Sequence, residues 1–324
     1  MTFLVLKNIN GGGKTFCFFI DGMPLMCVCF YNFAFCKKQY MAMKAFFSSL
    51  IAAVAAFSGS GVAASAAADD FEGKAIGDTV RYVVAYDMKS VVDNMSGGWA
   101  HYTEPMRLEI GDKTARFYSY AAFRDDSLNS IRWERGERMA YFSRKVCWEL
   151  YKNYPKDGCF TFIDEVGNVN CCAYTEPVKT PEWQLVPDSA AILLGYQCRL
   201  AKTRYKGRTW SAWYAEDIPL DAGPWKLGGL PGLILRAYDA DSFYVFDATA
   251  LRQAPAGSVM TYKGEEYEDV TFDELMEQYK RYYADPFGYN RLYQPNAKMI
   301  LQDDDGNRLP DPKNIKYSPI ELSE

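Results

Sequence analysis

Short segments in which apolar and polar residues alternate recur from about position 79 onward, and turn residues separate them. These segments are rich in Tyr, Phe, Trp, Val and Thr, which is typical of antiparallel strands. A first strand is predicted at 79–86. Hairpins are predicted at 106–110 with 113–120, 159–166 with 169–174, 196–205 with 209–214, and 233–238 with 243–248. The pattern predicts a mainly β fold, either an antiparallel, strongly curved sheet or a half-open barrel.

One amphipathic helix is predicted at about 271–284. Thr271 and Glu274 have the spacing of a capping box. In a capping box, the side chain of each residue accepts a hydrogen bond from the backbone N–H of the other. The apolar positions then fall on one face suited to packing on a sheet, namely Phe272, Leu275, Met276, Tyr279 and Tyr282 or Tyr283. Pro286 is expected to stop the helix, and residues 286–324 are expected to form a polar, peripheral tail.

Residues 43–68 differ from the rest of the chain. Lys44 precedes a short apolar stretch, and small residues follow it at 64–68, which is the pattern of a secretory signal peptide. A membrane anchor is the alternative, but a span needs about 20 consecutive apolar residues. We expect residues 69–324 to be exported, periplasmic or secreted, as one soluble domain.

The 42 residues before Met43 are not expected in front of a signal peptide. We expect translation to start at Met41 or Met43, so that residues 1–42 are not part of the exported protein. A genuine membrane segment within 1–42 is the alternative.

Residues 69–324 carry 31 Lys and Arg against 40 Asp and Glu, a net charge of −9. A chain this acidic offers no electrostatic attraction for nucleic acid, so we expect no nucleic-acid partner. No cysteine stands at the end of the leader, where a lipid anchor would be attached. We therefore expect neither a lipid anchor nor a transmembrane span in the exported protein.

Five cysteines remain beyond the predicted leader, at Cys147, Cys159, Cys171, Cys172 and Cys198. An exported protein can form disulfides, and an odd number leaves at least one thiol free or paired elsewhere. Zinc sites need two or more residues between ligands, so the adjacent Cys171 and Cys172 are a poor metal pair. We expect disulfides among the five, with the connectivity open, and no metal or other cofactor.

The segment Gly223-Pro224-Trp225-Lys226-Leu227-Gly228-Gly229-Leu230-Pro231-Gly232-Leu233-Ile234 carries the most specific motif in the chain. It resembles the GLPGLI family of small exported bacterial envelope proteins, named for the hexapeptide that is Gly229 to Ile234 here. The end of the chain, Tyr317 to Leu322, is similar to the usual ending of that family. The resemblance implies export and lends no established activity.

The motif has a structural interpretation. Pro231-Gly232 suits the central positions of a type II turn, with Gly232 at positive φ. Gly228 and Gly229 would allow backbones to approach closely, and Leu230, Leu233 and Ile234 are expected to be buried. A phosphate-binding loop is the alternative, but neither glycine spacing of such loops is present. We expect a structural role for all nine family positions, Gly223, Pro224, Trp225, Gly229, Leu230, Pro231, Gly232, Leu233 and Ile234.

No catalytic residue is predicted. His101 is the sole histidine, and we expect it to be partly exposed in a turn region and without a catalytic role. We expect a protein that binds a hydrophobic or amphipathic ligand, such as a lipid, a lipoprotein or a peptide, on a concave sheet. A structural or partner-binding envelope component is one alternative. A carboxylate-based hydrolase is the other, since acidic residues are abundant.

Overall fold

The computed structural model describes residues 14–18, 26–30, 73–93, 98–137, 146–296, 299–302 and 306–322. A 14-stranded sheet and three helices make up most of this part of the chain, which confirms the predicted mainly β, mostly antiparallel fold. The signal peptide predicted at 43–68 lies outside the described residues. Within 1–42, the strands β1 (Lys14–Phe18) and β2 (Met26–Phe30) pair as a separate antiparallel ribbon.

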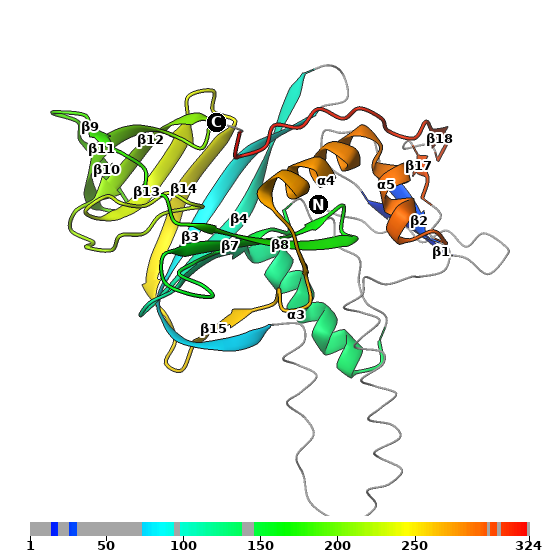
Figure 1. Cartoon of the computed structure of the whole chain (residues 1–324), viewed down its shortest axis with the longest axis horizontal. Coiled ribbons are helices and arrows are strands. Elements are labelled where there is room, and N and C mark those ends of the chain that lie inside the picture. The colour runs from blue at the N-terminus through cyan, green and yellow to red at the C-terminus, as the bar shows by residue number, and fades with distance from the viewer. Residues whose placement is uncertain are drawn as a thin grey trace, which may run out of the picture.

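The main sheet runs through twelve strands in one path (Figure 1). In spatial order these are β10 (Ala191–Leu193), β11 (Tyr196–Tyr205), β12 (Arg208–Ala215), β13 (Leu233–Asp239), β14 (Tyr244–Gln253), β3 (Lys74–Asp93), β4 (Trp99–Gly111), β5 (Ala115–Ser119), β6 (Glu149–Lys152), β7 (Cys159–Val166), β8 (Asn170–Pro177) and β16 (Glu268–Asp269). Off this path, β9 (Gln184–Leu185) pairs with β11, and β15 (Val259–Tyr262) pairs with β3. Only β16 joins its neighbour in parallel.

The four predicted hairpins are confirmed by the strand pairing. In two of them the turn residues explain the hairpin, since Gly167 and Asn168 between β7 and β8 both have positive φ, as do Lys206 and Gly207 between β11 and β12. Two consecutive residues at positive φ match the twist of antiparallel strands. The first predicted strand is longer than expected, since β3 has 20 residues and pairs with β4 along most of its length.

The sheet bends back on itself, so that strands far apart in its order come into contact. Nine strand spacings separate β11 from β8, a distance of about 43 Å in a flat sheet. Yet the Nζ of Lys206, in the turn after β11, lies 2.7 Å from Oε2 of Glu176 on β8. The main hydrophobic core fills the space between these parts of the sheet and includes Trp210, Phe246 and Tyr174.

Strands β5 to β8 are buried on both faces. Phe162 and Tyr174 on one face belong to the main core. Ile163 and Ala173 on the other face pack against Tyr267 in a second core cluster. Both faces of this part of the sheet are therefore covered by chain from elsewhere in the sequence.

The predicted helix is confirmed as α4 (Phe272–Ala284), with the reciprocal capping box of Thr271 and Glu274 in place. The expectation that residues 286–324 form a polar, peripheral tail is wrong at its start, because Pro286 is the first residue of α5 (Pro286–Tyr293). Proline suits that position, since the N–H it lacks would have no partner there. A third helix, α3 (Tyr120–Glu134), was not predicted.

The end of the chain is not a peripheral tail between residues 317 and 321. Beyond the short ribbon of β17 (Leu301–Gln302) and β18 (Arg308–Leu309), it runs back to the sheet (Figure 1, red). Arg208 on β12 donates hydrogen bonds to the carbonyls of Ile320 and Pro319 and to the hydroxyl of Ser318. Glu321 is only 6 % exposed, so the tail completes the core.

The motif at 223–234 forms the loop that leads into β13, and its glycines act differently from the prediction. Gly229, at φ +84°, is the residue in the left-handed region, and Gly232 is not. A Cβ at Gly232 would lie 2.1 Å from the carbonyl oxygen of Ala215, so backbone contact excludes any side chain there. Leu230, Leu233 and Ile234 are buried as predicted.

Among the residues that the structure describes, no helix is both long and apolar enough to cross a bilayer.

Candidate functional site

A cavity of about 160 Å³ lies between the main sheet and α4. The motif loop contributes Trp225 to its wall, and the C-terminal segment contributes Tyr317, Ile320 and Glu321. Seven tyrosines line it, namely Tyr102, Tyr174, Tyr244, Tyr279, Tyr282, Tyr283 and Tyr317. The cavity therefore combines ring faces with hydroxyl groups, and it is bounded by three parts of the chain that are distant in sequence.

Local periodicity explains how two of these walls form. On β7, Phe162, Asp164 and Val166 alternate with residues of the opposite face and so share the cavity side. On α4, Leu275, Tyr279 and Tyr282 or Tyr283 recur at intervals of three or four and point at the sheet. The strand and the helix thus each direct one face toward the cavity.

Asp164 is the distinctive polar group of the cavity. Its side chain accepts hydrogen bonds from the Tyr279 hydroxyl on α4 and from the backbone N–H of Glu165. The residue is only 7 % exposed, and burial raises the pKa of its carboxyl group to about 6. No lysine, arginine or histidine within the described ranges forms an ion pair with it. Near neutral pH, Asp164 is thus a mostly ionised carboxylate in a buried, aromatic setting.

Glu321, a second carboxylate at the cavity, is held by two lysines. Lys226 Nζ lies 2.5 Å from Glu321 Oε2, and Lys206 Nζ lies 2.6 Å from Oε1. Lys226 also donates to Glu176 at 2.5 Å and to the Tyr174 hydroxyl at 2.7 Å. These five groups form a buried clasp, in which both carboxylates and both ammonium groups are compensated.

Lys226 occupies this clasp because of its neighbours in the motif loop. Trp225 has a left-handed backbone, at φ +52°, which is a strained conformation for a residue with a side chain. Its ring packs 5.5 Å from that of Trp210 and 5.9 Å from that of Tyr205. Consecutive side chains of the loop are thereby both buried, with the Lys226 side chain at 0 % exposure.

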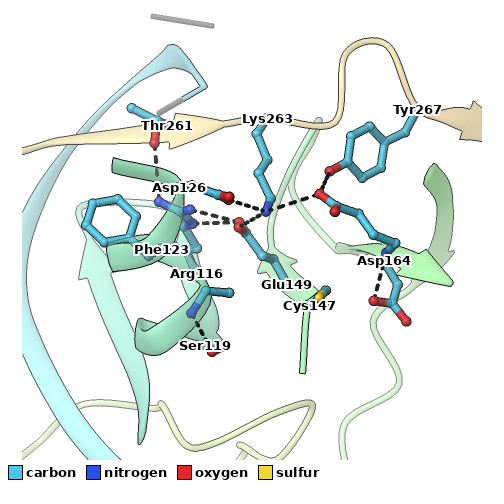
Figure 2. Close-up of polar contacts among 12 residues, drawn as sticks. Arg116, Ser119, Phe123, Asp126, Cys147, Glu149, Asp164, Thr261, Lys263 and Tyr267 are labelled. Carbon is cyan, nitrogen blue, oxygen red and sulfur yellow. Dashed lines mark hydrogen bonds and ion pairs between the residues drawn. The ribbon is translucent and has the colours of Figure 1, made fainter. Parts of the chain in front are cut away.

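A second polar cluster lies on the opposite face of β5 to β7 (Figure 2). Arg116 and Lys263 both reach Glu149, with N–O distances of 2.9 Å and 3.0 Å. Burial alone would raise the pKa of Glu149, but Arg116 and Lys263 together lower it to about 2. The Tyr151 hydroxyl donates to the same carboxylate at 2.6 Å. Every group in this cluster is partnered, so it ties β5, β6 and the segment after β15 together.

Glu165 is the third acidic residue of the cavity lining, but its carboxylate belongs to this second cluster. It accepts a hydrogen bond from the Tyr267 hydroxyl at 2.7 Å and lies 3.9 Å from Lys263 Nζ. Figure 2 shows Asp164 turned away from Lys263, as expected for adjacent residues of one strand. Of the three acids at the cavity, Asp164 alone is therefore left without an ion pair.

The predicted disulfides are not present, since Cys147, Cys159, Cys171, Cys172 and Cys198 are all free thiols in the structure. Part of the reason is the strand register. Cys159 stands opposite Pro177, five residues from Cys172 along β8, which is about 17 Å and far beyond the reach of a disulfide. Cys147 lines the cavity and donates to the side chain of Asn168.

The structure also places the motif residues and His101. Of the motif, Trp225 alone lines the large cavity, and Gly223 and Gly229 border a hollow of about 30 Å³ near Lys152, which has room for about one water molecule. His101 is exposed on β4. In the described part of the chain, no three His, Cys, Asp or Glu side chains are grouped to hold a metal ion.

Asp164, Tyr279 and Lys226 were not predicted as site residues. A signal for Asp164 is present in the sequence, because it follows Phe160 and Phe162 at the same alternating positions of a strand. A charged residue at an inward-facing position of a strand is costly to bury, so its presence there indicates a functional role. Lys226 is likewise the one charged residue in an otherwise apolar and glycine-rich motif.

Comparison with known proteins adds a family model. Residues 169–236 match the model described as "Protein of unknown function (Porph_ging)". The matched segment contains Tyr174, Glu176, Lys206 and Lys226 of the clasp, and it ends within β13. Glu321, Asp164 and α4 lie outside it.

Two solved structures are similar to this chain, "Structure of PNGF-II in P21 space group" and "Structure of PNGF-II in C2 space group". Each is 13 % identical and matches 62 % of this chain, with TM-scores of 0.43 and 0.44. The chain spans about a third of the length of those structures, 33 % in each case. No curated protein matches the sequence.

Proposed function

We propose that residues 69–324 form an exported envelope protein of the GLPGLI type that binds a small amphipathic ligand in the cavity between the sheet and α4. The observation that carries the proposal is the cavity itself, whose walls combine seven tyrosine rings with their hydroxyls and with acidic groups. Aromatic walls with placed polar groups suit a ligand that is apolar in one part and polar in another. Export is supported by the leader pattern at 43–68 and by the resemblance of the motif.

The cavity volume limits the part of a ligand that fits. A cavity of about 150 Å³ accommodates a benzene molecule, and this one measures about 160 Å³. The space suits one ring or a short alkyl chain, as a whole small molecule or as the end group of a lipid or peptide.

A carboxylate-based hydrolase is less well supported. A pair of carboxyl groups that cleaves a glycosidic bond needs one proton donor and a second carboxylate free to act. Asp164, with a pKa of about 6, has the properties of the donor. Glu321 and Glu165 are held by lysines, so the described cavity residues offer no free second carboxylate. This favours binding over hydrolysis.

A partner-binding role has separate support at the sheet edge near β10. Leu185 is 60 % exposed there and Ile192 is 74 % exposed. Exposed apolar side chains beside an edge strand are typical of contact surfaces. An envelope protein or lipoprotein is the partner we propose for this edge, and Ile192→Lys should abolish its co-purification if the edge is used.

Blocking the cavity tests the ligand-binding proposal. Met276 lines the cavity on α4, so Met276→Trp should fill it and abolish binding of benzyl alcohol, a single ring with one hydroxyl group. Leu292→Trp is the matched control, because Leu292 is 74 % exposed on α5 and outside the cavity lining. Ligand-observed NMR would measure binding. If wild type shows no binding, or if both variants behave as wild type, the proposal is wrong.

Export is tested by N-terminal sequencing of the protein recovered outside the cytoplasm. The expected first residue lies near Asp69. A first residue before position 60 would contradict the proposed signal peptide.

A further inference from the structure

Among the described residues that line the cavity, the charges do not balance. Three acidic residues line it, and the carboxylates of two of them, Glu165 and Glu321, have lysine partners as described above. No lysine, arginine or histidine is among the described residues that line the cavity. The remaining carboxylate, Asp164, therefore gives the cavity an uncompensated negative charge when it is ionised.

Among the described residues, the Asp164 carboxylate has hydrogen-bond donors but no counter-ion, and burial raises its pKa. The Tyr279 hydroxyl and the Glu165 N–H both donate to it. A buried charge without a partner of opposite sign is costly, because protein and ring faces replace the water that would solvate it. A positively charged ligand group would remove that cost, whereas a neutral group would not.

The rings beside Asp164 favour a cation as well. Tyr283 and Tyr317 are stacked with ring centroids 4.2 Å apart, and Tyr279 lies 5.4 Å from Tyr317. All three rings line the cavity, and the negative faces of tyrosine rings attract ammonium groups. Ring faces and carboxylate thus attract the same type of ligand.

We propose that the cavity binds a ligand with a protonated amine, which pairs with the Asp164 carboxylate while the apolar part of the ligand lies against Tyr279, Tyr283 and Tyr317. This inference rests on the proposed function of the cavity and specifies the chemical class of its ligand. The volume selects a primary amine on a single ring or a short alkyl chain.

Three ring compounds of similar size and different charge test the inference on the wild-type protein, produced from the full-length coding sequence. These probes are benzylamine, benzyl alcohol and benzoate, measured by ligand-observed NMR at about pH 7.5, where Asp164 is ionised and the amine is protonated. Benzylamine should bind about tenfold more tightly than benzyl alcohol. Benzoate should show no binding, because its charge repels that of Asp164.

A variant pair isolates the carboxylate. Asp164→Asn preserves the size and one of the two acceptor oxygens but removes the charge, so it should reduce benzylamine affinity to that of benzyl alcohol. Glu265→Gln removes one negative charge at an exposed residue that pairs with Lys74 and does not line the cavity. That control should leave all three affinities unchanged.

The outcomes separate the inference from the proposed function. Equal binding of benzylamine and benzyl alcohol that Met276→Trp abolishes would overturn the amine preference and leave the cavity as a binding site. Absence of binding by all three probes would overturn both. If Asp164→Asn fails to fold, the comparison of the three probes on wild type still decides the question.

Discussion

Lys226 Nζ lies 2.5 Å from Glu321 Oε2, although 95 positions separate the two residues in the chain. Lys226 belongs to the motif loop, and Glu321 lies in the C-terminal segment after β18. The ion pair therefore anchors the C-terminal segment against the region where the sheet bends back on itself. Since Tyr317 and Ile320 of that segment line the cavity, the same ion pair keeps the cavity wall in place.

Lys226→Met is expected to destabilise the protein by about 3 kcal/mol, because it leaves the buried Glu321 and the half-buried Glu176 with Lys206 as their remaining cation. The free energy of unfolding in urea measures the effect. Lys74→Met is the control, since Lys74 pairs with Glu265 on the surface and such pairs contribute less than about 1 kcal/mol. Equal effects of the two variants would show that the clasp does not stabilise the fold.

Gly232→Ala is expected to destabilise the protein by about 3 kcal/mol, since its Cβ would overlap the carbonyl oxygen of Ala215. Gly257→Ala is the control, because alanine there introduces backbone strain without any steric overlap. Gly257 has φ +82° and no atom near its Cβ position, so alanine there should cost about 1 kcal/mol. Thermal unfolding compares the two, and a larger loss at Gly257 would contradict the close-approach interpretation.

The stability contribution of Asp164 should depend on pH. Its folded pKa of about 6 lies above the ordinary value of 3.8, so its contribution is most favourable below pH 3.8 and is lost as pH rises through 6. Asp164→Asn should therefore gain stability relative to wild type between these pH values, by about 3 kcal/mol in total. Urea unfolding at several pH values would show it, and a constant difference between the two proteins would contradict the raised pKa.

Titratable and charged groups on every element packed against Asp164 influence its pKa. They are Glu165 on the same strand, Cys172 on β8, Tyr102 on β4, Tyr279 and Tyr283 on α4, Tyr317 in the C-terminal segment and Lys263 behind the sheet. Tyr279→Phe removes the hydroxyl that stabilises the carboxylate, so the Asp164 pKa should rise further. The same urea unfolding series in the Tyr279→Phe variant would show this rise.

Glu149 should show the opposite pH dependence. Arg116 and Lys263 lower its pKa to about 2 against an ordinary value of 4.5, so its contribution is complete above pH 4.5 and is lost as pH falls through 2. Glu149→Gln should cost about 3 kcal/mol at neutral pH and less in acid. Unfolding curves at neutral and acidic pH test this prediction. An equal loss at both values would exclude an ionised Glu149 as the source of the stability.

The successful predictions from sequence rest on local signals. Gly167-Asn168 and Lys206-Gly207 adopt the turns that their residue types favour. Thr271 and Glu274 form the capping box that their spacing predicts. Helix α3 has no such signal, because its cap Ser119 is followed by Ala122 where a capping box needs Glu or Gln.

Other features could not be predicted because they depend on contacts between distant segments. The φ of Gly232 is not positive, yet only glycine fits there, because a side chain would overlap the carbonyl oxygen of Ala215. No turn rule describes that contact. The absence of disulfides follows partly from a register that holds Cys159 far from Cys172. The C-terminal segment looks polar along the sequence, but Arg208 satisfies its backbone carbonyls and so allows its burial.

The sequence by itself determined the four hairpins, the middle of β3 and α4, because turn chemistry, alternation and capping act between neighbouring residues. It also contains the motif that resembles a family of exported proteins. Only the tertiary structure decided which inward-facing residues meet. The bend of the sheet brings Lys206 to Glu176, and the packing of α4 brings Tyr279 to Asp164. The cavity and its unbalanced carboxylate follow from those distant contacts.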